Sequence, residues 1–177
     1  MSIRYNVSAL LREPLGSTRE YELDERVLIE EDVPRHQQIA GRAEFLRTNS
    51  GVLVKAQLHG VDHERCSRCL REFELPVSLE IEEEFYVSVN AEAVESPATE
   101  EDAAVFHIDA KHTLDLDEAV RQYWTAALPM QPLCQQNCRG LCDRCGQNLN
   151  QGACSCSPKQ DERWSTLSQL AQKTKGE

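Results

Sequence analysis

Hydrophobic and polar residues alternate along most of the first half of the chain. The alternating runs cover residues 3–9, 20–29, 39–45, 52–58 and 74–89. A period of two places one side of each strand in a core and the other in water, which is typical of antiparallel sheets. Turn-forming sequences separate the runs, namely Pro14-Leu15-Gly16, Asp32-Val33-Pro34 and Asn49-Ser50-Gly51. The pattern predicts an antiparallel meander of about five strands, as a curled sheet or an open barrel.

A helical pattern begins after Thr113. Four apolar residues recur every three or four positions and so line one face of a helix: Leu116, Val120, Tyr123 and Ala127. Pro129 ends this helix. Asp115 and Glu118 lie three residues apart, which predicts a capping box at the start of the helix. We expect the helix to cover one face of the sheet.

Two other segments complete the expected organisation. Residues 90–104 are rich in Ala, Glu, Ser and Pro without a period, which predicts an acidic loop. After Pro158, apolar residues at helical spacing predict a short packing helix: Trp164, Leu167, Leu170 and Ala171. The expected fold is α+β, with an antiparallel β-rich domain over residues 1–130, a cysteine-rich module over 131–157 and a short helical tail over 158–177.

Charge and hydropathy exclude several classes of protein. The 177 residues carry 19 basic and 30 acidic side chains, a formal net charge of −11. This balance argues against a protein that coats nucleic acid or anionic lipid by bulk charge. The apolar stretches are shorter than the roughly 20 residues of a membrane span, and no signal peptide is visible. We therefore expect a cytoplasmic protein without a membrane partner.

The negative charge is concentrated in the middle of the chain. Residues 73–130 hold 2 basic and 14 acidic side chains, a net charge of −12, and residues 131–177 hold 6 basic and 4 acidic ones, a net charge of +2. One interpretation of the acidic middle is a solvated face and loop. The other is a surface that meets a basic partner, such as a ribosomal protein.

The strongest chemical signal is a set of eight cysteines in four pairs: Cys66 with Cys69, Cys134 with Cys138, Cys142 with Cys145 and Cys154 with Cys156. Without a secretion signal, metal binding explains them better than disulfides. A spacing of two residues lets both sulfurs face one ion while backbone N–H groups of the turn point towards them. Gly146 directly after a pair suits such a turn, because glycine accepts a positive φ.

We predict two structural zinc ions, each held by four cysteines. One site lies within a segment that has the look of a small zinc ribbon: Cys142, Cys145, Cys154 and Cys156. The other site joins the remaining pairs and would attach the sheet to the C-terminal module: Cys66, Cys69, Cys134 and Cys138. Buried inert thiols and a redox pair are the alternatives to zinc.

Other sites fit parts of the sequence less well. Cys138, Cys142 and Cys145 have the C-x3-C-x2-C spacing of clusters that cleave S-adenosylmethionine, but that enzyme class needs a βα scaffold. His63 lies three residues before Cys66 and is an alternative ligand. No nucleophile elbow or Gly-rich loop indicates an enzyme. Zinc with four cysteine ligands also leaves no position open to a catalytic water.

The residues around the cysteines form two longer motifs. The central one reads Arg65-Cys66-Ser67-Arg68-Cys69-Leu70 and is followed by Phe73. The C-terminal one comprises Leu128-Pro129, Pro132-Leu133-Cys134, Cys138-Arg139-Gly140-Leu141-Cys142, Cys145-Gly146 and Asn148-Leu149-Asn150. Together they resemble the motifs of the YceD family, the large ribosomal RNA subunit accumulation proteins. The resemblance implies a bacterial or plastid role in the accumulation, processing or assembly of large-subunit ribosomal RNA, and it implies no catalytic residue.

We therefore expect a non-enzymatic factor whose partner is large-subunit ribosomal RNA or its precursor particles, with no small-molecule substrate. Basic residues of the ribbon and the tail are candidates for contact with RNA phosphates: Arg139, Arg144, Lys159 and Arg163. A metal-dependent nuclease in RNA maturation is an alternative, and it would need clustered carboxylates that bind magnesium. A thiol redox sensor is another, and it would bind little zinc.

Overall fold

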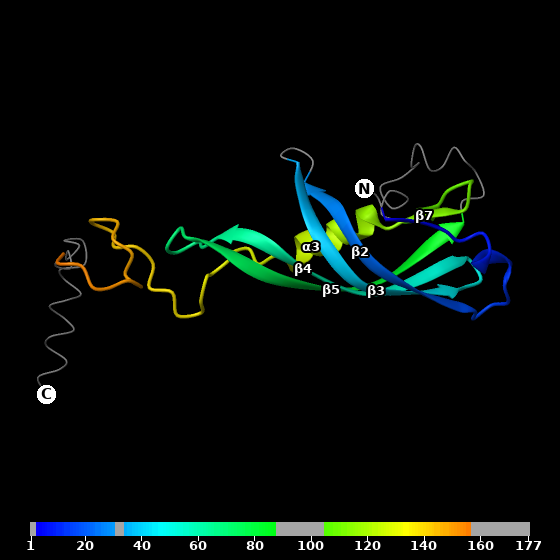
Figure 1. Ribbon diagram of the computed structural model, residues 1–177, viewed down its shortest axis with the longest axis horizontal. Coiled ribbons are helices and arrows are strands. Elements are labelled where there is room, and N and C mark those ends of the chain that lie inside the picture. The colour runs from blue at the N-terminus through cyan, green and yellow to red at the C-terminus, as the bar shows by residue number, and fades with distance from the viewer. Residues whose placement is uncertain (1–2, 31–33, 88–104, 157–177) are drawn as a thin grey trace, which may run out of the picture. The chain divides into compact units, whose positions relative to one another are not determined.

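The computed structural model describes residues 3–30, 34–87 and 105–156, which divide into two compact units. The first unit is drawn from residues 1–67 and 71–134, and the second from residues 68–70 and 135–177. The strands and the α-helix that these described residues form belong to the first unit (Figure 1). The acidic loop predicted for residues 90–104 and the helical tail predicted for residues 158–177 lie outside the described residues.

A seven-stranded sheet dominates the first unit. Its strand order is β1-β7-β6-β5-β4-β3-β2, and only β5 and β6 run parallel to each other. The four long strands form the antiparallel meander that the alternating pattern predicts. The strands are β1 (Arg4–Asn6), β2 (Thr18–Glu30), β3 (Arg35–Arg47), β4 (Gly51–Arg65), β5 (Glu72–Val87), β6 (His107–Ile108) and β7 (Thr113–Asp115).

The sheet curls until its two edges approach each other. Tyr5 on the edge strand β1 and Tyr21 on the opposite edge strand β2 have ring centroids 4.6 Å apart. Both rings also contact the ring of Phe45 on β3, with centroid distances of 5.1 Å for Tyr5 and 4.7 Å for Tyr21. Aromatic side chains, and not backbone hydrogen bonds, therefore join the two edges, so the predicted curled, mainly antiparallel sheet is confirmed as a half-barrel.

The first predicted strand differs from the observed one in extent and in partner. The alternation over residues 3–9 predicts a strand of the meander. Instead, β1 has three residues and pairs with β7, at the opposite end of the strand order from β2. Leu10 then begins a short 3-10 helix (Leu10–Arg12) and is buried there. Strands β6 and β7 were not predicted, because two or three residues are too few to show a period.

Helix α3 (Asp117–Ala127) covers the inner face of the sheet, as expected (Figure 1). Its residue Trp124 is fully buried and lies against Gly60 of β4. A Cβ atom at Gly60 would lie 2.9 Å from the Trp124 ring, so glycine is what lets the ring approach the strand. The helix therefore completes the core that the apolar side of β2–β5 begins.

The predicted capping box of this helix is wrong. The Asp115 carboxylate accepts a hydrogen bond from the Asp117 backbone N–H at 2.9 Å, and the Asp117 carboxylate accepts one from the Ile3 N–H at 2.8 Å. Glu118 instead pairs with Arg121 at 2.8 Å on the helix surface. The acidic residues at the helix start thus bind neighbouring backbone, including that of the residue before the first strand, in place of the reciprocal pair expected from their spacing.

Strands β4 and β5 extend beyond the rest of the meander as a two-stranded hairpin. The pairing of β3 with β4 ends at Ile39 and Gly60, whereas β4 and β5 stay paired from Val61–Pro76 to Arg65–Glu72. An isolated two-stranded hairpin is marginally stable in water. The far end of this hairpin, which carries the first cysteine pair, therefore needs stabilisation from another source.

Among the described residues, no helix is long and apolar enough to cross a membrane.

Candidate metal centres

The first cysteine pair lies in the turn that joins β4 to β5. The Cys66 backbone N–H donates to the Arg71 carbonyl at 2.8 Å, which closes the turn. Leu70, directly after the second cysteine, has a φ of 58°, in the left-handed region that most residues avoid. Both cysteines are buried, at 0% and 5% exposed. The chain therefore accepts a strained residue here in order to bring two sulfurs to one side of the turn.

The third cysteine pair repeats the same backbone arrangement. The Cys142 N–H donates to the Gln147 carbonyl at 2.8 Å, again five residues ahead. Gly146 follows the second cysteine with a φ of 72°, as its position in the sequence suggests. The two turns, which have the sequence Cys-x-Arg-Cys in common, thus also share one hydrogen bond and one left-handed residue. This is the geometry in which a C-x-x-C pair presents both sulfurs to a single ion.

The structure brings the eight cysteines together as two sets of four. Within each set the ligand atoms all lie within 4.8 Å of one another. Four sulfurs at the zinc–sulfur bond length of about 2.3 Å lie roughly 3.8 Å apart around a tetrahedral ion, so both sets fit one ion each. None of the eight forms a disulfide. The sets are those grouped from the sequence: Cys66, Cys69, Cys134 and Cys138, and Cys142, Cys145, Cys154 and Cys156.

The thiols of the second set have pKa values shifted in opposite directions. Backbone N–H groups of Cys145 and Arg144 lower the pKa of the Cys142 thiol to about 7. The hydrogen bond with Cys145, together with burial, raises the pKa of the Cys156 thiol to about 12. The turn stabilises one thiolate, but a second negative charge beside it is unfavourable. A divalent cation removes this conflict, because coordinated thiols are deprotonated.

An asparagine supports the first set from the second unit. Asn150 Nδ2 donates to the Cys138 sulfur at 3.3 Å and to Asn148 Oδ1 at 2.8 Å. Asn150 Oδ1 accepts from the Arg139 backbone N–H at 2.8 Å, which fixes the orientation of the amide. Hydrogen bonds of this kind orient metal ligands and stabilise thiolates. Sequence reasoning gave Asn148 and Asn150 no role beyond their place in a motif.

The substitution Asn150→Ala is expected to weaken zinc binding at the first set by about 10- to 100-fold, the usual effect of losing a group that orients a ligand. Competition with a chromophoric chelator measures this affinity. Asn137→Ala, at an exposed amide in the same segment, is the matched control and should bind zinc like the unchanged protein. Equal affinity for both variants would show that the Asn150–Cys138 hydrogen bond does not support the ion.

The other candidate residues fall outside the two sets. His63 lies in β4 opposite Glu74 and belongs to neither set. The C-x3-C-x2-C interpretation requires three cysteines at one cluster, but Cys138 lies in the first set while Cys142 and Cys145 lie in the second. Arg139 and Arg144 are exposed, and neither forms an ion pair with a described residue. Lys159 and Arg163 lie outside the described residues.

Known proteins resemble this chain over most of its length. It is 32% identical over 98 residues to an uncharacterized protein of Mycobacterium leprae. The aligned region covers 55% of this chain and 43% of the relative. It is 28% identical over 122 residues to an uncharacterized protein of Mycobacterium tuberculosis. That aligned region covers 69% of this chain and 56% of the relative. The chain thus spans about half the length of these relatives. No solved structure matches it.

The family profile described as "Large ribosomal RNA subunit accumulation protein YceD" matches residues 54–171. This range includes all eight cysteines, both turns with a left-handed residue, and the asparagine that supports Cys138. It begins within β4, so the hairpin that carries the first cysteine pair is also part of the match. The chain therefore belongs to the YceD family.

Proposed function

We propose that the protein is a non-enzymatic factor that supports the accumulation, processing or assembly of large-subunit ribosomal RNA, and that two structural zinc ions hold its fold together. The family supports the role in ribosomal RNA accumulation. The observation that carries the zinc assignment is the presence of two sets of four cysteines, each compact enough for one ion. Sulfur ligands in tetrahedral sets of four favour zinc or iron–sulfur centres over harder cations.

In this proposal the zinc ions stabilise the structure and take no part in a reaction. Each ion has four thiolate ligands, so no coordination position remains for water or a substrate. One ion stabilises the tip of the β4–β5 hairpin, which extends beyond its neighbouring strand. The other organises residues 142–156, which hold a single isolated β-bridge and little other backbone pairing. The protein acts in the cytoplasm, where precursor particles form.

The proposed contact with RNA uses the exposed arginines beside the cysteines of the second unit. The Arg139 and Arg144 side chains are free to reach phosphates, because neither forms an ion pair with a described residue. Arginine recognises phosphate through bidentate hydrogen bonds as well as charge. Phosphate contacts release counterions, so the affinity of such a surface falls as salt rises.

Charge reversal at these positions, Arg139→Glu with Arg144→Glu, is expected to weaken association with large-subunit precursors and to flatten its salt dependence. Each lost phosphate contact lowers the slope of log K against log salt by about one. Gradient sedimentation at several salt concentrations measures both effects. Arg12→Glu, at an exposed arginine of the first unit, is the control and should sediment with precursors as the unchanged protein does.

The same series tests the proposed function as a whole. Native purification from cells should recover large-subunit precursor RNA with the protein, and the recovered RNA should be lost in the double variant but not in Arg12→Glu. Incubation of labelled precursor RNA with the zinc-loaded protein, with and without magnesium, should leave the RNA intact. Magnesium-dependent cleavage would instead favour the nuclease, and reversible thiol oxidation with little bound zinc would favour the redox sensor.

A further inference from the structure

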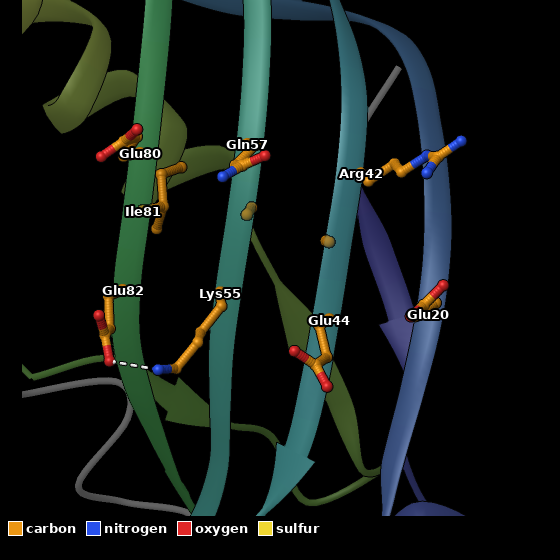
Figure 2. Close-up of a pocket in the computed structure, with 10 residues that line it drawn as sticks. Glu20, Arg42, Glu44, Lys55, Gln57, Glu80, Ile81 and Glu82 are labelled. Atoms are coloured by element: carbon orange, nitrogen blue, oxygen red, sulfur yellow. Dashed lines mark ion pairs between the residues drawn. The ribbon is translucent and has the colours of Figure 1, made fainter.

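The face of the sheet opposite α3 carries polar side chains from all four long strands. Within the described part of the chain, no helix or strand packs on this outer face of β2–β5. A hollow of about 520 Å³ lies on it, and a second hollow of about 440 Å³ shares Arg42, Gln57 and Glu80 with the first. The two hollows therefore form one continuous depression along the strands. Figure 2 shows the labelled side chains that line its larger hollow.

The strand register arranges these side chains in two rows across the sheet, because residues paired in register point to the same face. The first row is Glu20 on β2, Glu44 on β3, Lys55 on β4 and Glu82 on β5. The second row is Glu22, Arg42, Gln57 and Glu80 on the same strands. Figure 2 labels the four residues of the first row and Arg42, Gln57 and Glu80 of the second. Carboxylates thus outnumber cations, and the outer face is negatively charged.

The two cations of these rows are already engaged. Lys55 Nζ lies 2.8 Å from Glu82 Oε1, and Arg42 Nη2 lies 3.9 Å from Glu22 Oε1. Glu20, Glu44 and Glu80 form no ion pair with any residue that the structure describes. These three carboxylates therefore line the depression without an ion pair inside the described chain, although Lys55 is the register partner of Glu44 on its other side.

Two of these carboxylates oppose each other directly. Glu20 and Glu44 are register partners on the neighbouring strands β2 and β3. Like charges at directly opposed positions destabilise a sheet, whereas a cation between them would reverse the sign of the interaction. A local arrangement that costs stability without a compensating contact is typical of binding surfaces. The Glu20–Glu44 pair therefore indicates that a cationic ligand completes this face.

We propose that the outer face of β2–β5 binds a lysine- and arginine-rich segment of a partner protein. The ligand is a protein segment and not RNA, because the face would repel phosphates. The depression extends along the strands over both hollows, which suits an extended chain with several cationic side chains. The inference deepens the proposed function, and rests on it only in identifying the partner as a basic protein of the ribosomal precursor. RNA and basic protein then bind surfaces of opposite charge.

The test measures binding of a twelve-residue lysine- and arginine-rich peptide to the zinc-loaded full chain at low ionic strength. The double substitution Glu44→Gln with Glu80→Gln removes two unpaired carboxylates from the depression. It is expected to raise the Kd about fivefold, as the loss of two exposed charge pairs implies. Glu72→Gln with Glu74→Gln is the matched control, since it makes the same charge change on exposed residues of β5 outside both hollows. The control should bind with an unchanged Kd.

Folding of the test variant is checked in the same samples. Glu44 lies between Glu20 and Lys55 in the register, so removal of its charge relieves one repulsion and loses one attraction. The Tm of the free Glu44→Gln/Glu80→Gln variant should therefore stay close to that of the unchanged protein. Weaker peptide binding by a variant of undiminished Tm therefore reports the loss of a contact.

Three results would overturn the inference: no binding of the peptide, an equal loss of affinity in the two double variants, or displacement of the peptide by an RNA oligonucleotide that binds the same face. Peptide binding is measured without ribosomal particles, so its failure is distinct from that of the proposed function. Loss of particle association with intact peptide binding would contradict the proposed function and leave this inference standing.

Discussion

Replacement of Cys69 with serine is expected to leave the protein with one bound zinc ion instead of two and to expose the tip of the β4–β5 hairpin. Cys69 belongs to the first set of four cysteines, and removal of one ligand leaves the set incomplete. Zinc binding is linked to folding by roughly 10 kcal/mol or more in small zinc peptides, so this is the largest effect we expect. Elemental analysis gives the zinc content, and hydrogen exchange should accelerate in residues 61–76 and 131–141.

Two variants serve as controls for this experiment. Ser67→Ala changes an exposed side chain in the same turn, where the contact observed is a backbone hydrogen bond from Ser67 N–H to the Pro132 carbonyl. It should keep both ions. Cys145→Ser should also lose one ion, but exchange should then accelerate in residues 142–156. A Cys69→Ser protein that retains two ions, or an unchanged protein that contains iron and absorbs visible light, would contradict the zinc assignment.

The long strands could be predicted because each one has a buried and an exposed side over many residues. In β4 and β5 the exposed and buried positions alternate through most of their 15 and 16 residues. The short strands β6 and β7 carry no such pattern, and they form because β5, β1 and each other supply partners for their backbone groups. Strand propensity and hydrophobic period are properties of one segment of the sequence, whereas the pairing of β6 and β7 depends on tertiary structure.

Spacing defines the four cysteine pairs but leaves three ways to combine them into two sets, and the structure brings together the predicted combination. The surroundings of the cysteines could not be predicted. A C-x-x-C pair determines its own turn, so both turns and the role of Gly146 could be predicted from local sequence. The hydrogen bond from Asn150 to Cys138 joins residues 12 positions apart in a segment with little regular structure. No hydrophobic period or residue spacing in the sequence predicts this bond.

The negative charge of the outer face could not be predicted from the sequence, for a different reason. Charge summed over segments assigns Glu20 and Glu44 to a balanced stretch and Glu80 to the acidic middle. The strand register places all three on one face, and the register depends on the turns that join the strands. Glu84, which belongs to the same acidic run as Glu80, instead accepts hydrogen bonds from Thr48 and Ser50 at a turn.

The largest effect expected within the sheet itself is that of Asp62→Ala. Asp62 is a fully buried carboxylate on β4 that accepts hydrogen bonds from several elements. Its Oδ2 accepts from Trp124 Nε1 of α3 at 3.0 Å, and its Oδ1 accepts from Gln37 Nε2 at 3.0 Å and pairs with Arg35. Alanine would leave the Trp124 and Gln37 donors without this acceptor, whereas Arg35 keeps the His63 carbonyl and Glu64. Two buried donors left unsatisfied cost about 2–6 kcal/mol. Urea unfolding of the zinc-loaded protein measures this loss.

Two further variants separate the charge of Asp62 from its role as an acceptor. Asp62→Asn keeps one carbonyl oxygen but loses the charge that Arg35 faces, so its loss of stability should be smaller than that of alanine. Trp124→Phe removes the indole N–H while keeping an aromatic ring over Gly60. If the Trp124–Asp62 hydrogen bond holds α3 on the sheet, Asp62→Ala and Trp124→Phe should be non-additive, because both remove that bond. Additive losses would show that apolar packing of the indole ring, and not its bond to the buried carboxylate, holds the helix in place.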